Sequence, residues 1–269
     1  MVPAPSAARG PPGGAPLHWD AVNSSAPPIS GPPPSPPPGP LPERAGFWGR
    51  VARPIGAVLL AFGLSIPLAA VLLGTDLSDD SVNAIFALVG SALILLFGYV
   101  FLTALPAHER RWVTALKHTR GGAVGLGVVI GIGIIIASAS LIVLGTLVDG
   151  GLEDRLEEQA TDVGPELWQI VLMVIALVVL APLGEELVFR GLLLRGLVRR
   201  LNFWPAALIT SVLFAASHAD AYAIWPRAIA LVATGLTLAW LYRWRGYAAA
   251  VTAHATVNGV AAIALIAAG

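Results

Sequence analysis

The stretch Leu172–Gly191 reads LMVIALVVLAPLGEELVFRG and places two adjacent carboxylates, Glu185 and Glu186, inside an otherwise apolar run. An ionised carboxylate near the centre of a bilayer costs roughly 2.5 to 3.5 kcal/mol on insertion scales. A chain keeps such a charge mainly where it pairs, titrates or catalyses. Glu185 and Glu186 are therefore the first candidates for function in this sequence.

The composition is that of a membrane protein. Apolar residues make up 56% of the 269 residues and charged residues 12%, whereas about 25% of the residues in an average soluble domain are charged. The formal net charge is +0, which favours neither nucleic acid nor an acidic partner. We therefore expect membrane lipid as a partner and no nucleic acid. Cysteine is absent, which excludes a disulfide framework, a thiolate metal site and a cysteine nucleophile.

Residues 1–42 hold 15 of the 22 prolines, mixed with Gly, Ala and Ser. Such a segment cannot bury enough apolar surface to offset its chain entropy. It also lacks the apolar stretch of a signal peptide. We expect residues 1–47 to form a disordered, Pro-rich cytoplasmic tail and residues 48–269 to form a transmembrane domain.

Seven apolar segments follow the tail and predict an all-α fold, a polytopic transmembrane helix bundle with about seven spanning segments. The fifth and sixth segments are short. The segments are Ile55–Leu73, Val82–Leu105, Ala123–Val148, Leu167–Leu183, Ala206–Ser217, Ala228–Tyr242 and Ala248–Ala268. Basic and non-basic connections alternate between them, so the positive-inside rule predicts a multi-pass protein of the cell membrane with a cytoplasmic N-terminus and an external C-terminus.

Polar side chains on three of these segments reach a similar depth. The fourth segment continues past its carboxylates into an Arg-rich end, and the fifth returns antiparallel after a short turn. At a rise of 1.5 Å per residue, Glu185 lies about 24 Å and His218 about 21 Å from that turn. His254 and Asn258 lie about 12 to 18 Å beyond the cytoplasmic end of the last segment. We expect these four side chains in the cytoplasmic half of the bilayer.

Spacing along each helix separates their roles. Glu186 and Arg190 stand at i and i+4, so their charges can pair within one helix. That pairing leaves Glu185 without the cation and makes Glu185 the better candidate for catalysis. His254 and Asn258 are also at i and i+4, and an imidazole and an amide on one face can donate two hydrogen bonds to one oxygen atom.

His218 follows Phe214 by one helical turn. A glutamate and a histidine that meet across a hairpin can hold one water between them, as general-base catalysis requires. We therefore expect Glu185 and His218 at hydrogen-bond or one-water distance.

Taken in order on three apolar segments, these residues resemble the motifs of the CPBP intramembrane endopeptidases, also called the CAAX protease and bacteriocin-processing or Abi family. The resemblance covers about residues 167–266. It implies an all-helical membrane bundle whose site opens toward the cytoplasm, and a glutamate-type peptidase that uses neither a catalytic metal nor another cofactor. The motifs are Glu185-Glu186-x-x-x-Arg190, Phe214-x-x-x-His218 and His254-x-x-x-Asn258.

By motif position, the resemblance implies a role for each residue. Glu185 and His218 would activate the hydrolytic water, while His254 and Asn258 would form the oxyanion hole. Arg190 would hold Glu186, and Phe214 would support the site. The substrate would be a membrane-associated protein or peptide, but the prenylated CAAX substrates of the eukaryotic members are not carried over to this chain.

Two other interpretations stay open. The first is a zinc peptidase, because a glutamate and two histidines are a plausible ligand set, although no His-Glu-x-x-His pattern occurs. The second is a non-catalytic membrane protein, such as a scaffold, an immunity protein or a transporter, in which the carboxylates form a proton relay or structural pairs. Peptide hydrolysis needs the oxygen-binding face of His254 and Asn258, and a scaffold does not.

Overall fold

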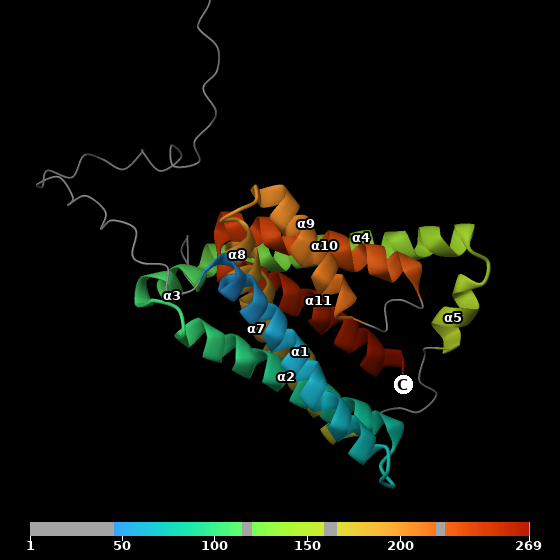
Figure 1. Ribbon diagram of the computed structural model, residues 1–269. Coiled ribbons are helices and arrows are strands. Elements are labelled where there is room, and N and C mark those ends of the chain that lie inside the picture. Colours follow the sequence, from blue (N-terminus) through green and yellow to red (C-terminus); the bar gives the residue numbers. More distant parts are fainter. Residues whose placement is uncertain (1–45, 115–119, 159–165, 219–223, 269) are drawn as a thin grey trace, which may run out of the picture. The chain divides into compact units, whose positions relative to one another are not determined.

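The computed structural model describes residues 46–114, 120–158, 166–218 and 224–268. These residues form helices joined by short turns, and the predicted all-α fold is confirmed (Figure 1). The predicted tail, residues 1–47, lies outside the described residues except for its last two positions.

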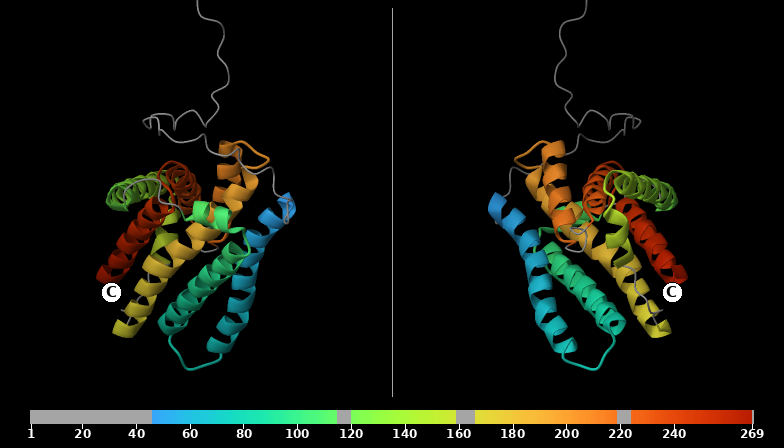
Figure 2. Two further views of the ribbon diagram at one scale, coloured as in Figure 1. Left: turned by 90° about the vertical axis from the view of Figure 1, so that its left-hand side faces the viewer. Right: turned by 90° about the vertical axis from the view of Figure 1, so that its right-hand side faces the viewer.

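The chain begins with a helical hairpin. Helix α1 (Phe47–Leu72) and helix α2 (Asp79–Thr103) run antiparallel and pack against each other (Figure 2). The Ser78 hydroxyl accepts a hydrogen bond from the Ser81 backbone N–H at 3.3 Å and caps the start of α2. The short α3 (Ala107–Val113) leads to the long α4 (Arg120–Val148), and α5 (Leu152–Glu158) follows.

The fourth apolar segment is one 31-residue helix, Leu167–Leu197, whose backbone register changes along its length. We call it the broken helix. It consists of α6 (Leu167–Val174), the π-helical η2 (Ile175–Leu180), α7 (Ala181–Glu185), the π-helical η3 (Glu186–Leu194) and α8 (Arg195–Leu197). π-helical turns are rare and occur often at functional sites. Both carboxylates lie at the junction of α7 and η3.

Three helices complete the fold. They are α9 (Phe203–Ala216), α10 (Trp225–Arg245) and α11 (Tyr247–Ala268). The turn between α10 and α11 is made by Gly246, whose φ of 89° favours glycine because a side chain would be strained there.

Helix lengths and composition make the chain a multi-pass membrane protein. Five of the described helices are long and apolar enough to span a bilayer, namely α1, α2, α4, the broken helix and α11. Helix α9 is apolar but has 14 residues, and α10 is not among the five. All seven predicted segments are nevertheless helical. Large apolar side chains on α1 are exposed, with Leu59 at 66% and Ile66 at 64%, as expected for a surface in lipid.

The broken helix lies between two groups of helices (Figure 2). Helices α1 and α2 pack on one side of it, and α9, α10 and α11 pack on the other. Helix α4 covers α10 and α11 from outside. Buried side chains of the broken helix, including Val188, Phe189 and Leu193, form one apolar core with Phe214 of α9 and Ala239 of α10. The carboxylates therefore lie where these groups meet.

A charged cluster joins the N-terminal hairpin to the end of the broken helix. Both terminal nitrogens of Arg50 donate to the Glu109 carboxylate, Nη2 at 3.1 Å, and Arg199 Nη2 lies 3.3 Å from it. Burial raises the pKa of the Glu109 carboxyl, but the hydrogen bond and charge of Arg50, with the charges of Arg199 and His108, outweigh burial and leave the pKa below its ordinary value. Glu109 of α3 thus holds α1 and the chain after α8 together.

Candidate active site

Glu186 and Arg190 form a buried ion pair, as their i, i+4 spacing predicts. Arg190 Nη1 donates to Glu186 Oε1 at 2.7 Å, and the two side chains are 1% and 0% exposed, respectively. Arg190 Nη2 also donates to the Gly235 carbonyl on α10 at 3.3 Å. Loss of either partner would leave a buried charge uncompensated at a cost of about 3 to 5 kcal/mol. The pair therefore fixes η3 against α10.

His254 of α11 contacts the same carboxylate. Its Nδ1 lies 3.0 Å from Glu186 Oε1, and its side chain is 4% exposed. Because an ionised carboxylate only accepts hydrogen bonds, this contact assigns the Nδ1 proton to His254. The other ring nitrogen, Nε2, lies 3.8 Å from Glu185 Oε2, which is too long for a hydrogen bond but within ion-pair range. His254 thus contacts both carboxylates.

Glu185 keeps an acceptor that no protein group occupies. Its Oε2 is buried and has no hydrogen-bond partner among the described residues. Glu186 has one such oxygen too, but the Glu186 side chain is fully buried, whereas the Glu185 side chain is 12% exposed. A buried acceptor without a partner is unfavourable by about 1 to 3 kcal/mol. Glu185 is therefore the carboxylate suited to bind a water or a substrate group.

The Phe214 ring of α9 contacts side chains of the broken helix and of α11, and it also contacts His218. The Arg190 guanidinium carbon lies 4.5 Å from its centroid, which is a cation–π contact. The ring centroids of His218 and His254 lie 4.8 and 5.7 Å away. Phe189 of η3 packs edge-on against the same ring at 5.4 Å. Phe214, which the sequence singled out only as support, is thus the shared neighbour of both histidines and of the buried arginine.

A backbone carbonyl of α9 orients His218, which lies just after the end of that helix. Its Nδ1 donates to the Phe214 carbonyl at 2.9 Å, since a carbonyl can only accept. A neutral His218 therefore presents Nε2 as an acceptor. In the part of the chain that the structure describes, no hydrogen bond or ion pair joins Glu185 to His218. The expected direct contact is absent, and an approach bridged by one water stays a prediction.

The environment of Asn258 differs from the one that its spacing from His254 predicts. Its amide Nδ2 donates to the Leu177 carbonyl on the broken helix at 2.8 Å. The cause lies in the backbone of η2, where the Ala181 N–H bonds to the Ala176 carbonyl, five residues back. In that register the Leu177 carbonyl would accept from residue 182, which is Pro182 and has no N–H. Asn258 supplies the missing donor, so one of its two amide hydrogens is not directed at a shared oxygen with His254.

Residue spacing along the helices does not reveal Gly235 or the Leu177 carbonyl, because both take part through their backbone. A Cβ at position 235 would lie 2.7 Å from the Ser211 Cβ, so only glycine lets α10 approach α9 this closely. Pro182 inside an apolar helical run was the one available signal that a carbonyl nearby needs a side-chain donor.

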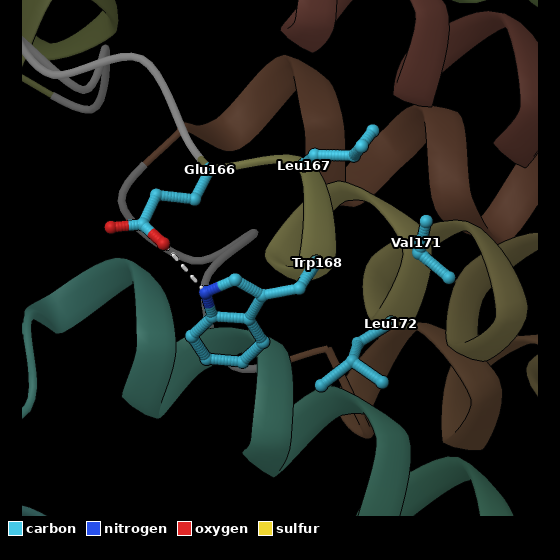
Figure 3. A pocket seen from close by; sticks show the side chains of 5 residues that line it. All are labelled: Glu166, Leu167, Trp168, Val171 and Leu172. Carbon is cyan, nitrogen blue, oxygen red and sulfur yellow. Dashed lines mark hydrogen bonds between the residues drawn. The ribbon is translucent and has the colours of Figure 1, made fainter.

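Two other features bear on the choice of site. Among the described residues, no group of three or more His, Asp or Glu side chains is arranged to hold a metal ion. A pocket at the start of α6 is apolar apart from Glu166, whose carboxylate accepts from Trp168 Nε1 at 2.7 Å (Figure 3). It contains none of the predicted site residues, and its lining is Glu166, Leu167, Trp168, Val171 and Leu172.

The residues of this site lie in a segment whose sequence matches a known protein family. Residues 167–260 match the sequence model of the family described as type II CAAX prenyl endopeptidase Rce1-like. This segment is similar to that family. It includes all three motifs, so the resemblance found in the sequence is confirmed for it. The match does not include α1, α2 or α4.

The chain is also similar to one curated protein that is named as a peptidase. Over 73 residues the chain is 36% identical to "Putative membrane peptidase YdiL" of Bacillus subtilis (strain 168). The match covers 27% of this chain and 28% of that protein's length. No solved structure shows significant similarity to the chain.

Proposed function

We propose that the chain is an intramembrane endopeptidase that hydrolyses a membrane-associated protein or peptide without a metal ion. The observation that carries this proposal is the convergence on Glu185 and His254 of side chains from the broken helix, α9 and α11. The Rce1-like match of residues 167–260 and the peptidase name of the relative support it.

In the proposed reaction, one water lies between two acceptors, the Glu185 carboxylate and His218 Nε2. It donates one hydrogen bond to each, so its lone pair faces the substrate carbonyl. As the oxygen–carbon bond forms, Glu185 takes the water proton, and it returns that proton to the amine when the carbon–nitrogen bond breaks. Each step conserves protons within the site.

The oxyanion of this reaction needs donors. His254 Nδ1 already donates to Glu186, so His254 can donate through Nε2 only as the imidazolium. The second amide hydrogen of Asn258 is the other proposed donor, since the first is taken by Leu177.

The test is hydrolysis by the purified chain in proteoliposomes against a peptide library that includes prenylated and unmodified members. We expect cleavage by the wild type, only a small residual rate in Glu185→Gln, and wild-type cleavage by Glu153→Gln, which makes the same exchange at an exposed position of α5. Cleavage by Glu185→Gln at the wild-type rate would contradict the mechanism. Wild-type protein that is folded yet cleaves no member would favour the scaffold interpretation.

Metal dependence separates the proposal from the zinc peptidase. We expect the rate to persist after exhaustive chelation, because the electrophile is polarised by His254 and Asn258. Activity that is lost to the chelator and restored by zinc would favour the zinc enzyme.

We also propose that residues 1–47 form a cytoplasmic tail and residues 48–269 the peptidase domain, with an external C-terminus. Because the native chain contains no cysteine, it serves as the unlabelled control for cysteine labelling. With a membrane-impermeant maleimide on intact cells, Thr75→Cys should react and Ser35→Cys should not. The reverse pattern would overturn the proposed topology.

A further inference from the structure

Tyr247 is a half-buried contact of the broken helix that belongs to none of the three motifs. It is the first residue of α11, and its hydroxyl donates to the Leu183 carbonyl at 2.6 Å. Leu183 precedes Glu185 by two residues and lies with it in α7, the five-residue stretch between η2 and η3. The Tyr247 hydroxyl therefore binds the backbone immediately before the carboxylate proposed as base.

The three bonds from α11 to the broken helix lie along one face of α11. Tyr247, His254 and Asn258 are spaced by seven and four residues, which repeats one side of a helix. Two of the three bonds end on backbone carbonyls, those of Leu183 and Leu177, and these carbonyls lie on either side of Pro182. Helix α11 thus holds the segment before Glu185 at two points and contacts the carboxylates through His254.

The Leu183 carbonyl does not depend on Tyr247 for a partner. It also accepts the Glu186 backbone N–H. Removing the hydroxyl therefore leaves no unpaired backbone group, and the net loss of one hydrogen bond is small. The hydroxyl instead fixes the position of α7 relative to α11, the helix that carries His254 and Asn258.

We propose that Tyr247 is a positioning residue for the proposed hydrolysis and acts through Glu185 by fixing the Leu183 carbonyl to α11. This inference rests on the proposed function. A general base must be held within hydrogen-bond reach of its proton, and a displacement near 1 Å is sufficient to slow a reaction.

The test compares Tyr247→Phe with Tyr242→Phe in the full-length protein. Tyr242 is a matched control, because its buried hydroxyl also donates to a backbone carbonyl, that of Val113 in α3, at 3.0 Å. We expect Tyr247→Phe to lower kcat by about 10-fold with KM unchanged, a loss of the size that misplacement produces. We expect Tyr242→Phe to keep the wild-type kcat, with melting temperatures of the two variants alike. Equal kcat in both variants, or a loss wholly in KM, would overturn the proposal.

A double variant shows whether Tyr247 acts through Glu185. Adding Tyr247→Phe to Glu185→Gln should not lower the residual rate further, since the positioned group is already gone. A further 10-fold loss would assign Tyr247 another role. If Glu185→Gln itself retains the wild-type rate, the proposed function fails rather than the role of Tyr247.

Hydrogen exchange supplies a readout that does not need turnover. Peptides covering residues 181–187 should exchange faster in Tyr247→Phe than in the wild type, and at the wild-type rate in Tyr242→Phe. Unchanged exchange of this segment in Tyr247→Phe would overturn the inference even if no substrate were cleaved.

Discussion

Glu186 Oε1 accepts hydrogen bonds from both Arg190 and His254, at 2.7 and 3.0 Å. A single oxygen atom therefore joins the ion pair of the broken helix to α11. This contact requires a proton on His254 Nδ1 and leaves Nε2 facing Glu185. Glu186 is consequently more than a partner for Arg190, although it is not proposed to touch the substrate.

Glu185→Gln and Glu186→Gln should have different effects on folding. We expect Glu185→Gln to reduce turnover to a small residual rate and keep the fold, because Glu185 Oε2 accepts no hydrogen bond from the described residues. Glu186→Gln should cost about 3 to 5 kcal/mol, because it leaves the Arg190 charge buried and uncompensated. The yield of monodisperse protein in detergent and its melting temperature measure both. Equal losses in the two variants would show that the structural and catalytic roles are divided wrongly.

Asn258→Ala should lower turnover by about 10²- to 10³-fold if the amide also donates to the oxyanion. Since it leaves the Leu177 carbonyl without its donor, it should also cost about 1 to 3 kcal/mol of stability. Asn258→Asp should be worse, because a carboxylate repels both the carbonyl and the oxyanion. The matched control is Thr256→Val, which removes a hydroxyl that bonds to the Thr252 carbonyl within α11. Unchanged turnover in a destabilised Asn258→Ala would make Asn258 purely structural.

Gly235→Ala should destabilise the protein by about 1 to 3 kcal/mol through overpacking. The new Cβ would lie 2.7 Å from the Ser211 Cβ and 2.9 Å from its Cα, and a backbone atom cannot move aside. Displacing α10 would also move the carbonyl that Arg190 binds. Gly133→Ala on α4, where a Cβ meets nothing within 4 Å, is the control. Similar melting temperatures for the two alanine variants would disprove the close α9–α10 contact.

Acid should weaken the charged cluster around Glu109. A carboxyl whose pKa is lower in the folded state stabilises the fold fully above its ordinary value of 4.5. That stabilisation disappears as the pH falls below 4.5 through the lowered folded-state pKa. Melting temperatures of the wild type and Glu109→Gln should therefore converge as the pH falls below 4.5 and differ at neutral pH. A constant difference across this range would exclude Glu109 as the group responsible.

The sequence predicted the helices better than it predicted the contacts between them. Hydropathy located all seven helices, and i, i+4 spacing gave the Glu186–Arg190 pair. Contacts between helices could not be predicted, because the spacing of residues along one helix does not determine how that helix is rotated about its axis. No single segment predicts the hydrogen bond between His254 and Glu186. The same holds for the contacts of Phe214 with the broken helix and α11. The partner of Asn258 was missed because it depends on a π-helical turn, which no hydrophobic period indicates.

The change of register in η2 also alters which environment each side of the broken helix faces. In a regular α-helix, eleven residues make about three turns, so Ile175 and Glu186 would project from the same side. Ile175 is 41% exposed, whereas Glu186 is 0% exposed. One helix can thus present hydrocarbon to lipid in its first half and carry charge inward in its second. Since each residue that a π-helical turn takes up in excess of an α-helical turn rotates every later side chain by about 100° relative to an uninterrupted helix of the same sequence, η2 turns the carboxylates away from the side where Ile175 meets the acyl chains and into the interior.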